Sequence, residues 1–458
     1  EVQLRNWLQK FLDSKEDGGV RQGAGTLLAY ALRQQGGSEG VVRIKSEIIA
    51  SQTWEKVLKK EENTYLWEVS GAIISAVMDD VLHTTEVFKA NLLNEIYKWY
   101  IKEEELPFDY KAFLLYSLLG AMADRRVDGD LKLKFLPLFQ ELPSQGYSWI
   151  GEAGIMQIIT DPKIPLSKKE ELAQISLKKL EAFQSSGKSL NQLLEENVIQ
   201  RFDLAILGLV SGQSLYFKAQ VSKLLQGLGG VSKEILDFWE DYTVFVAGKG
   251  REFSSWEMER LREILKGLPE EWRKTVGVII SVPESRRTFG RSGEFSRVLG
   301  AAFYNGGIVI YGDLRELLKE KGKEEANKWF ARAVFHEIAH TRHFFGFTIE
   351  QLQAFQFYWE SVRNNPQRVA RDYGLQNLWE YVATLFEDYA LDSLGFMAEA
   401  KKDAFLLEAF KTVVDTLKYQ VKDKWKVRIY RIEGDGKLSW REVDIDKDGL
   451  PIIPSDWE

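Results

Sequence analysis

Apolar stripes at helical spacing, each containing small residues, recur along the first half of the sequence. They occupy residues 23–28, 69–74, 114–120, 151–156 and 204–208. The stripes lie roughly 40–50 residues apart, close to the period of two-helix solenoid repeats. Small residues let helices approach closely, and each helix pair then needs a neighbour to cover its apolar face. We therefore expect residues 1–232 to form an all-helical domain, either HEAT-like repeats or an irregular bundle.

The length and charge of the chain limit its organisation and its partners. At 458 residues it is too long for one hydrophobic core, so two or three domains are expected. No run approaches the roughly 18 consecutive apolar residues of a membrane-spanning helix, and we expect no membrane span. The net charge of −7 provides no basic surplus for phosphates, which argues against a nucleic-acid partner.

Cysteine is absent from the sequence, so any transition-metal site must be built from histidine and carboxylate ligands. The chain begins with Glu1 rather than Met, as a processed or trimmed chain would. Together with a calcium-like segment near its end, this favours a secreted or extracytoplasmic protein. A cytoplasmic protein trimmed for expression is the alternative.

The pattern changes after residue 232, and residues 233–425 predict an α+β domain. Ser254 and Ser255 can cap a helix over residues 256–266. Residues 276–282 read as a strand, and residues 298–311 as a hairpin with an Asn-Gly-Gly turn. Helices are expected from about residue 314 to 424. The last segment, 426–458, predicts a β-hairpin tail, with strands at 427–432 and 438–443 around a turn at 434–436.

Two of the four histidines frame the motif His336-Glu337-Ile338-Ala339-His340. Its surroundings predict a helix, on which positions i and i+4 share a face about 6 Å apart, so both imidazoles can bind one zinc ion. Glu337 points slightly aside, where it can hold a water molecule. Zinc makes this water acidic near neutral pH, and the carboxylate takes its proton as it attacks a carbonyl. Two surface histidines on an amphipathic helix are the alternative.

A catalytic zinc needs a third protein ligand and one open position. His343 follows His336 by seven residues, about 10 Å along the helix axis, which is too far to share an ion, so packing is its expected role. Glu380 is the lone charge in the apolar helical stretch 378–386. An unpaired carboxylate would be costly there, whereas a metal ligand is satisfied. Glu380 is therefore the predicted third ligand, with Glu387 in reserve.

These residues resemble the catalytic domain of the anthrax-lethal-factor-like metallopeptidases, which are gluzincins. The resemblance covers about residues 250–420, and its second motif matches Tyr373-Gly374, Asn377, Glu380, Tyr381-Val382, Ala383 and Phe386. It implies that Glu380 is the third zinc ligand and that Tyr373 stabilises the oxyanion, a task that suits a neutral phenol donor. A plain tyrosine at the start of a helix is the alternative for Tyr373.

The resemblance also implies how the site is supported and how substrate binds. Family members often carry an acidic residue one turn after the ligand glutamate; this chain has Thr384 there, and Glu387 can substitute for it. Zincins of this kind bind extended peptide on an edge strand before the zinc helix. Residues 308–311 lie in the corresponding place, with an ordinary core hairpin as the alternative.

The acidic segment near the C-terminus copies half of a calcium loop. Asp444, Asp446 and Asp448, followed by Gly449, match the first six positions. The twelfth position is Ser455, so no bidentate glutamate closes the loop. A β-turn is the favoured interpretation, and a weak calcium site is the alternative.

The sequence thus predicts a zinc-dependent endopeptidase with one catalytic ion, acting on peptide or protein substrates. Its helical domain would position substrates or an inhibitory partner. Two alternatives stay open: a helical-repeat interaction scaffold with an inactive zincin domain, and a gluzincin aminopeptidase. The aminopeptidases place their repeats after the zinc motif and carry a Gly-x-Met-x-Asn sequence that this chain lacks.

Overall fold

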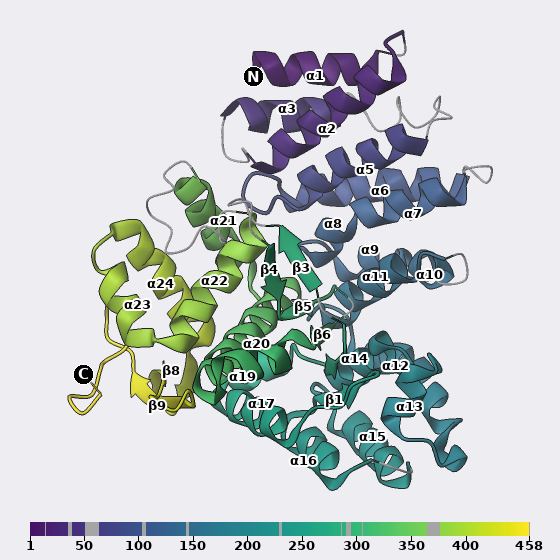
Figure 1. The fold of residues 1–458 in the computed structure, drawn as a ribbon. Coiled ribbons are helices and arrows are strands. Elements are labelled where there is room, and N and C mark those ends of the chain that lie inside the picture. Colours follow the sequence, from purple (N-terminus) through teal and green to yellow (C-terminus); the bar gives the residue numbers. More distant parts are fainter. Residues whose placement is uncertain are drawn as a thin grey trace. The chain divides into compact units, whose positions relative to one another are not determined.

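A computed structural model describes residues 1–13, 15–34, 39–50, 64–102, 107–142, 146–228, 231–284, 286–289, 295–304, 306–363 and 376–457. The fold is mainly helical, with a small mixed sheet and a short antiparallel tail (Figure 1). The chain forms two compact units. Unit 1 comprises residues 1–164 and 348–364, and unit 2 comprises residues 165–347 and 365–458.

Unit 1 consists of helices, and the stripes at residues 23–28, 69–74, 114–120 and 151–156 all lie in them. Its described helices are α1 (Val2–Leu12), α2 (Gly18–Gln34), α3 (Glu39–Ala50), α5 (Thr64–Met78), α6 (Glu86–Lys102), α7 (Phe108–Ser117), α8 (Leu119–Ala123), α9 (Gly129–Lys134), α10 (Leu136–Glu141), α11 (Ser148–Thr160) and α21 (Ile349–Arg363). Helices near one another in sequence pack together, as α1 does on α2, α2 on α5, α5 on α7 and α10 on α11, because each apolar stripe needs a neighbour to cover it.

Buried lysine–aspartate pairs recur along unit 1. They are Lys45–Asp80, Lys89–Asp124 and Lys132–Asp161. Each aspartate also accepts a hydrogen bond from the backbone N–H two residues further along the chain. The aspartates follow one another at intervals of about 40 residues, the length of a two-helix repeat, which favours repeats over an irregular bundle here.

Helix α21 belongs to unit 1, although its sequence lies between the two motifs of the predicted zinc site. Gln356 Nε2 donates to Asp80 Oδ1 at 3.0 Å. His83, the histidine outside the motif region, places Nε2 3.3 Å from Glu360 Oε2. This hydrogen bond raises the pKa of His83. This assignment could not be predicted, because an apolar helix face does not specify which hydrophobic core it joins.

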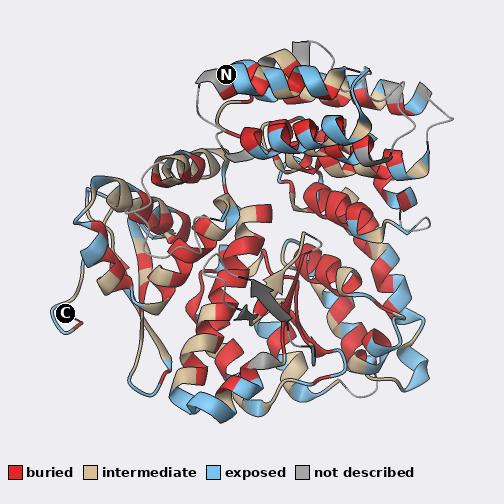
Figure 2. Ribbon diagram, turned by 45° about the horizontal axis from the view of Figure 1, so that its top comes forward, coloured by how far each residue is buried: buried red, intermediate tan, exposed pale blue. Residues whose placement is uncertain are grey.

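Unit 2 contains a four-stranded sheet in the order β1 (Phe245–Gly248), β2 (Val278–Ser281), β6 (Gly307–Ile310), β5 (Gly300–Ala302). The first three strands are parallel, and β5 is antiparallel to β6. Strands β1, β2 and β6 are buried throughout (Figure 2). A separate two-stranded ribbon is formed by β3 (Arg286–Phe289) and β4 (Phe295–Val298).

The described helices of unit 2 are α12 (Leu166–Glu181), α13 (Leu190–Glu195), α14 (Arg201–Ser211), α15 (Leu215–Gly227), α16 (Lys233–Tyr242), α17 (Ser255–Gly267), α18 (Glu270–Arg273), α19 (Asp313–Lys321), α20 (Lys323–Phe345), α22 (Leu378–Leu391), α23 (Ser393–Ala400) and α24 (Ala404–Leu417). Among them, α13, α14, α16 and α20 pack on this sheet, and α22, α23 and α24 pack on the C-terminal tail. Helix α14 meets the sheet so closely that a Cβ added at Gly208 would lie 2.4 Å from the carbonyl oxygen of Gly277. Helices α12–α15 belong to unit 2, whereas the sequence pattern groups them with the other helices before residue 232.

Several strand predictions can be compared with the structure. The strand at 276–282 and the hairpin at 298–311 are confirmed as β2 and as the β5–β6 pair. The prediction that residues 308–311 form an edge strand is wrong, because β6 lies between β2 and β5. Among the described strands, β5 is the edge on that side. The turn residue Asn305 lies outside the described residues.

The C-terminal tail is a three-stranded antiparallel sheet of β7 (Tyr419–Val421), β8 (Lys424–Ile432) and β9 (Leu438–Asp444). The predicted hairpin is confirmed, but the tail is part of unit 2. Arg428 Nη1 donates to the carbonyl oxygen of Gly267 at 2.9 Å, at the end of α17. Tyr389 Oη, on α22, donates to the carbonyl oxygen of Arg428 at 3.0 Å. The tail thus supports the helix that carries Glu380.

Candidate metal centre

Two helices carry the residues of the predicted zinc site. Helix α20 holds His336, Glu337 and His340, all buried. Helix α22 begins after Asn377, whose side chain accepts a hydrogen bond from the backbone N–H of Glu380 at 2.9 Å. This cap fixes Glu380 in the first turn, where the helix dipole favours a negative charge. The asparagine of the second motif therefore has a physical role: it starts the helix that presents the carboxylate.

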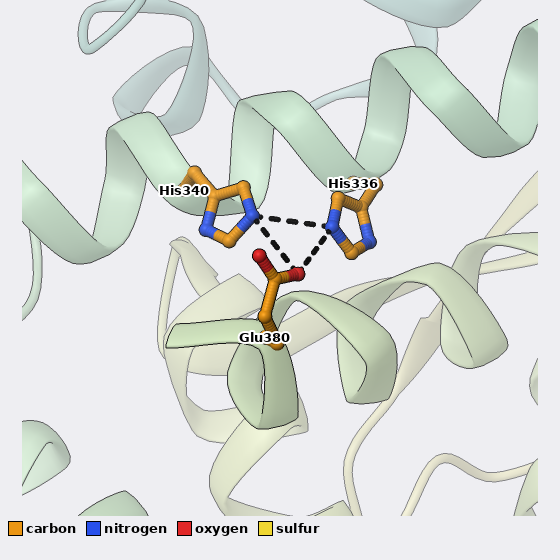
Figure 3. A group of neighbouring side chains, drawn as sticks. All are labelled: His336, His340 and Glu380. Atoms are coloured by element: carbon orange, nitrogen blue, oxygen red, sulfur yellow. Dashed lines mark hydrogen bonds and ion pairs between the residues drawn. The ribbon is translucent and has the colours of Figure 1, made fainter. Parts of the chain in front are cut away.

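The side chains of His336, His340 and Glu380 converge (Figure 3). Glu380 Oε2 lies 3.0 Å from His336 Nε2 and 3.5 Å from His340 Nε2. The two Nε2 atoms are 3.1 Å apart. The three potential ligand atoms all lie within 4.8 Å of one another. Two imidazole nitrogens and one carboxylate oxygen are a donor set that suits a catalytic zinc ion with an open position.

Glu337 is not part of this group of three. It is buried, and burial raises the pKa of its carboxyl, although the neighbouring histidines lower it. Strand β5 lies directly against it: a Cβ added at Gly300 would come within 2.8 Å of Glu337 Cγ. The backbone of Ala302 also hydrogen bonds to the Glu337 carboxylate. Strand β5 therefore lies directly against the Glu337 side chain, and any side chain at position 300 would clash with it.

The second nitrogen of His336 faces a different carboxylate. His336 Nδ1 lies 3.1 Å from Glu387 Oε2, and Arg332 donates from Nε to Glu387 Oε1. Burial lowers the pKa of His336, but its hydrogen bonds with Glu380 and Glu387 raise it more, to about 10. For Glu380, burial raises the pKa, but the two histidines lower it to about 2. Without a metal, the site therefore holds a proton on His336.

The other sequence candidates fall into three places. His343 is not in the metal group; its ring contacts Phe347 and Trp379, and burial lowers its pKa to about 3. Thr384 is buried in α22. Tyr373 lies outside the described residues, so its predicted role stays a prediction.

Two features near the site were missed in the sequence. One is Arg332, four residues before His336 and so on the same helix face. The other is an aromatic cluster of Tyr304, Phe344 and Trp379, in which the Tyr304 and Phe344 rings stack at 4.2 Å. Phe344 follows His340 by four residues and Trp379 precedes Glu380, so both spacings were available as signals.

The acidic segment at residues 444–449 forms a turn. Asp446 Oδ1 accepts hydrogen bonds from the backbone N–H groups of Asp448 at 2.8 Å and Leu450 at 2.9 Å. Asp444 pairs with Lys424 at 3.1 Å. Gly449 has φ of +82°, which suits the turn. This is the geometry of the favoured β-turn interpretation, and calcium binding stays a prediction.

Comparisons with known proteins add no relative. No protein-family model, curated protein or solved structure matches this chain significantly. Within the described part of the chain, no helix combines the length and apolarity that crossing a membrane requires.

Proposed function

We propose that this chain is a zinc-dependent endopeptidase. The observation that carries the proposal is the convergence of His336, His340 and Glu380 within 4.8 Å, with Glu337 buried on the same helix. These three residues would hold the ion. Zinc would polarise the substrate carbonyl and make a water molecule acidic near neutral pH.

The residues of the chain itself supply the proton transfers. Glu337 would take a proton from the attacking water and pass it to the leaving amine. Burial favours this role, because it raises the pKa of Glu337 and so makes its carboxylate a better proton acceptor. Strand β5 offers an edge for an extended peptide, and its backbone already touches Glu337. A peptide paired with β5 would therefore pass the general base.

The ligand order supports a gluzincin of the anthrax-lethal-factor-like kind. Two histidines separated by three residues precede a glutamate on a second helix, and Asn377 caps that helix. In this interpretation unit 2 is a zincin domain, and Tyr373 stabilises the oxyanion. Both assignments rest on the resemblance of the two motifs.

The test combines metal content with peptide cleavage. We expect one zinc ion per chain and hydrolysis of a denatured protein or a peptide library. Glu337→Gln should lower the cleavage rate by about 10²- to 10⁴-fold and retain zinc, because only the general base is removed. Glu324→Gln, at an exposed site on the same helix, is the matched control and should cleave normally. A wild type that binds zinc and cleaves nothing would refute the peptidase.

A further inference from the structure

A row of side chains leads along α20 to the buried histidine. Glu325, Trp329, Arg332 and His336 follow at spacings of four, three and four residues, and so share one helix face. Trp329 Nε1 donates to Glu325 Oε1 at 2.9 Å. The guanidinium carbon of Arg332 lies 4.8 Å from the centre of the Trp329 ring. Arg332 is therefore held by a cation–π contact and is not a freely moving surface residue.

Glu387 joins this row to the metal ligand from the opposite helix. It is 4 % exposed. Its Oε1 accepts a hydrogen bond from Arg332 Nε, and its Oε2 lies 3.1 Å from His336 Nδ1. A carboxylate that accepts a hydrogen bond from Nδ1–H fixes the tautomer of the imidazole and leaves Nε2 for a metal. It also fixes the ring orientation, because α20 and α22 pack against each other. Arg332 in turn pins Glu387 by a charge-assisted bond.

We propose that Arg332 and Glu387 form a relay that positions His336 for metal binding, with Arg332 acting only through Glu387. This rests on the proposed metal site. The relay takes the place of the acidic residue expected one turn after Glu380, where the chain has Thr384. The carboxylate comes instead from two turns further along α22, and a cation from α20 holds it. Neither residue touches the three convergent ligand atoms, so both are positioning residues.

The experiment measures zinc affinity by competition with a chelator on the full chain. Glu387→Gln should weaken zinc binding by about 10- to 100-fold, the usual cost of losing such an outer partner. Arg332→Gln should weaken it by a smaller factor. The double variant should bind zinc as Glu387→Gln does, because Arg332 has nothing to act through once Glu387 is neutral. The control is Lys328→Gln, which removes a cation paired with Glu324 on the same helix and should match the wild type.

Two further readouts separate positioning from stability. With Co²⁺ in place of zinc, the visible spectrum of Glu387→Gln should differ from that of wild type and Lys328→Gln. The Tm of the metal-free proteins reports folding, and the partly exposed Arg332 offers a variant that preserves the core if Glu387→Gln is unstable. The relay is overturned if both single variants bind zinc within twofold of wild type. It is also overturned if Arg332→Gln costs as much in the Glu387→Gln background as in the wild type. A wild type without zinc affinity would instead refute the metal site itself.

Discussion

Buried carboxylates occur in both units, but the chain neutralises them differently. In unit 1, each aspartate of the three recurring pairs has its own lysine and a backbone N–H group. In unit 2, the carboxylates of Glu337, Glu380, Glu387 and Asp388 surround two histidines and Arg332. The aspartates of unit 1 are therefore neutralised by lysines of the chain itself. The carboxylates of unit 2 depend instead on a histidine that must become charged.

The pKa values express this difference. The pKa of Asp80 is lowered in unit 1, because Lys45 outweighs the effect of burial. In unit 2, burial and the charge of Glu387 raise the pKa of Asp388 to about 7. Burial also raises the pKa of Glu337, so two carboxyls of this cluster lie in surroundings that disfavour their ionised form. The pairs of unit 1 thus neutralise their carboxylates within the fold, whereas a bound cation would favour the ionised form of the carboxyls in unit 2.

The largest expected effect tests the structural side of this comparison. Lys132→Ala should lower the free energy of unfolding by about 3–5 kcal/mol, because Asp161 would remain buried without its lysine. Urea unfolding with and without a chelator measures it, and the loss should be the same in both. Lys98→Ala, which removes an exposed pair with Glu95, is the control and should change stability little. A loss of unfolding free energy that depends on zinc would contradict a purely structural role for the pairs of unit 1.

The second prediction tests the metal side. Glu380→Ala should weaken zinc binding by roughly 10²- to 10³-fold, since zinc sites with four ligands gain about 10–16 kcal/mol in total. Without zinc, its stability should fall less than that of Lys132→Ala, because the Glu380 side chain is partly exposed whereas Lys132 and Asp161 are fully buried. Chelator competition gives the affinity, and Glu399→Ala, an exposed glutamate on α23, is the control. Zinc affinity within about threefold of wild type would remove Glu380 from the ligand set.

The third prediction concerns pH. A zinc ion must displace the proton that His336 holds below its pKa of about 10. Zinc affinity should therefore rise with pH, by about tenfold per unit between pH 6 and 8, and fall as the solution becomes acidic. Glu380 does not oppose this trend, because its pKa of about 2 keeps it ionised throughout. Calorimetry in two buffers of different ionisation heat should find about one proton released per zinc; a pH-independent affinity would contradict the charged-histidine state.

Local patterns carried most of what the sequence could predict. Ser254 caps α17 and forms a capping box with Glu257, and β5 pairs with β6 as the predicted hairpin requires. The spacing of His336 and His340 sufficed to place both on one helix face. These features depend on neighbours within a few residues, which is the range over which helix caps, turns and periodicity act.

Features that depend on distant partners could not be predicted. Strand β1 has only four residues, and its place in the sheet is set by parallel pairing with β2. The link between Arg332 and Glu387 joins residues 55 positions apart. The lysine–aspartate pairs of unit 1 also join residues about 30–35 positions apart. In each case the sequence contained the groups, but only the fold decides which charges meet.

The smallest change is expected at the acidic turn of the tail, where Asp444 and Asp446 are half-buried and Asp448 is exposed. Lys424 and Lys426 lower the pKa of Asp444, and Asp446 already accepts two backbone N–H groups. Calcium would have to compete with these partners, and no glutamate closes the loop. With a dissociation constant near 1 mM or weaker, 1 mM calcium should shift Tm by less than about 1 °C. Thermal unfolding of wild type and Asp448→Asn with and without calcium tests this, and a larger shift confined to the wild type would show that these carboxylates suffice for a cation site.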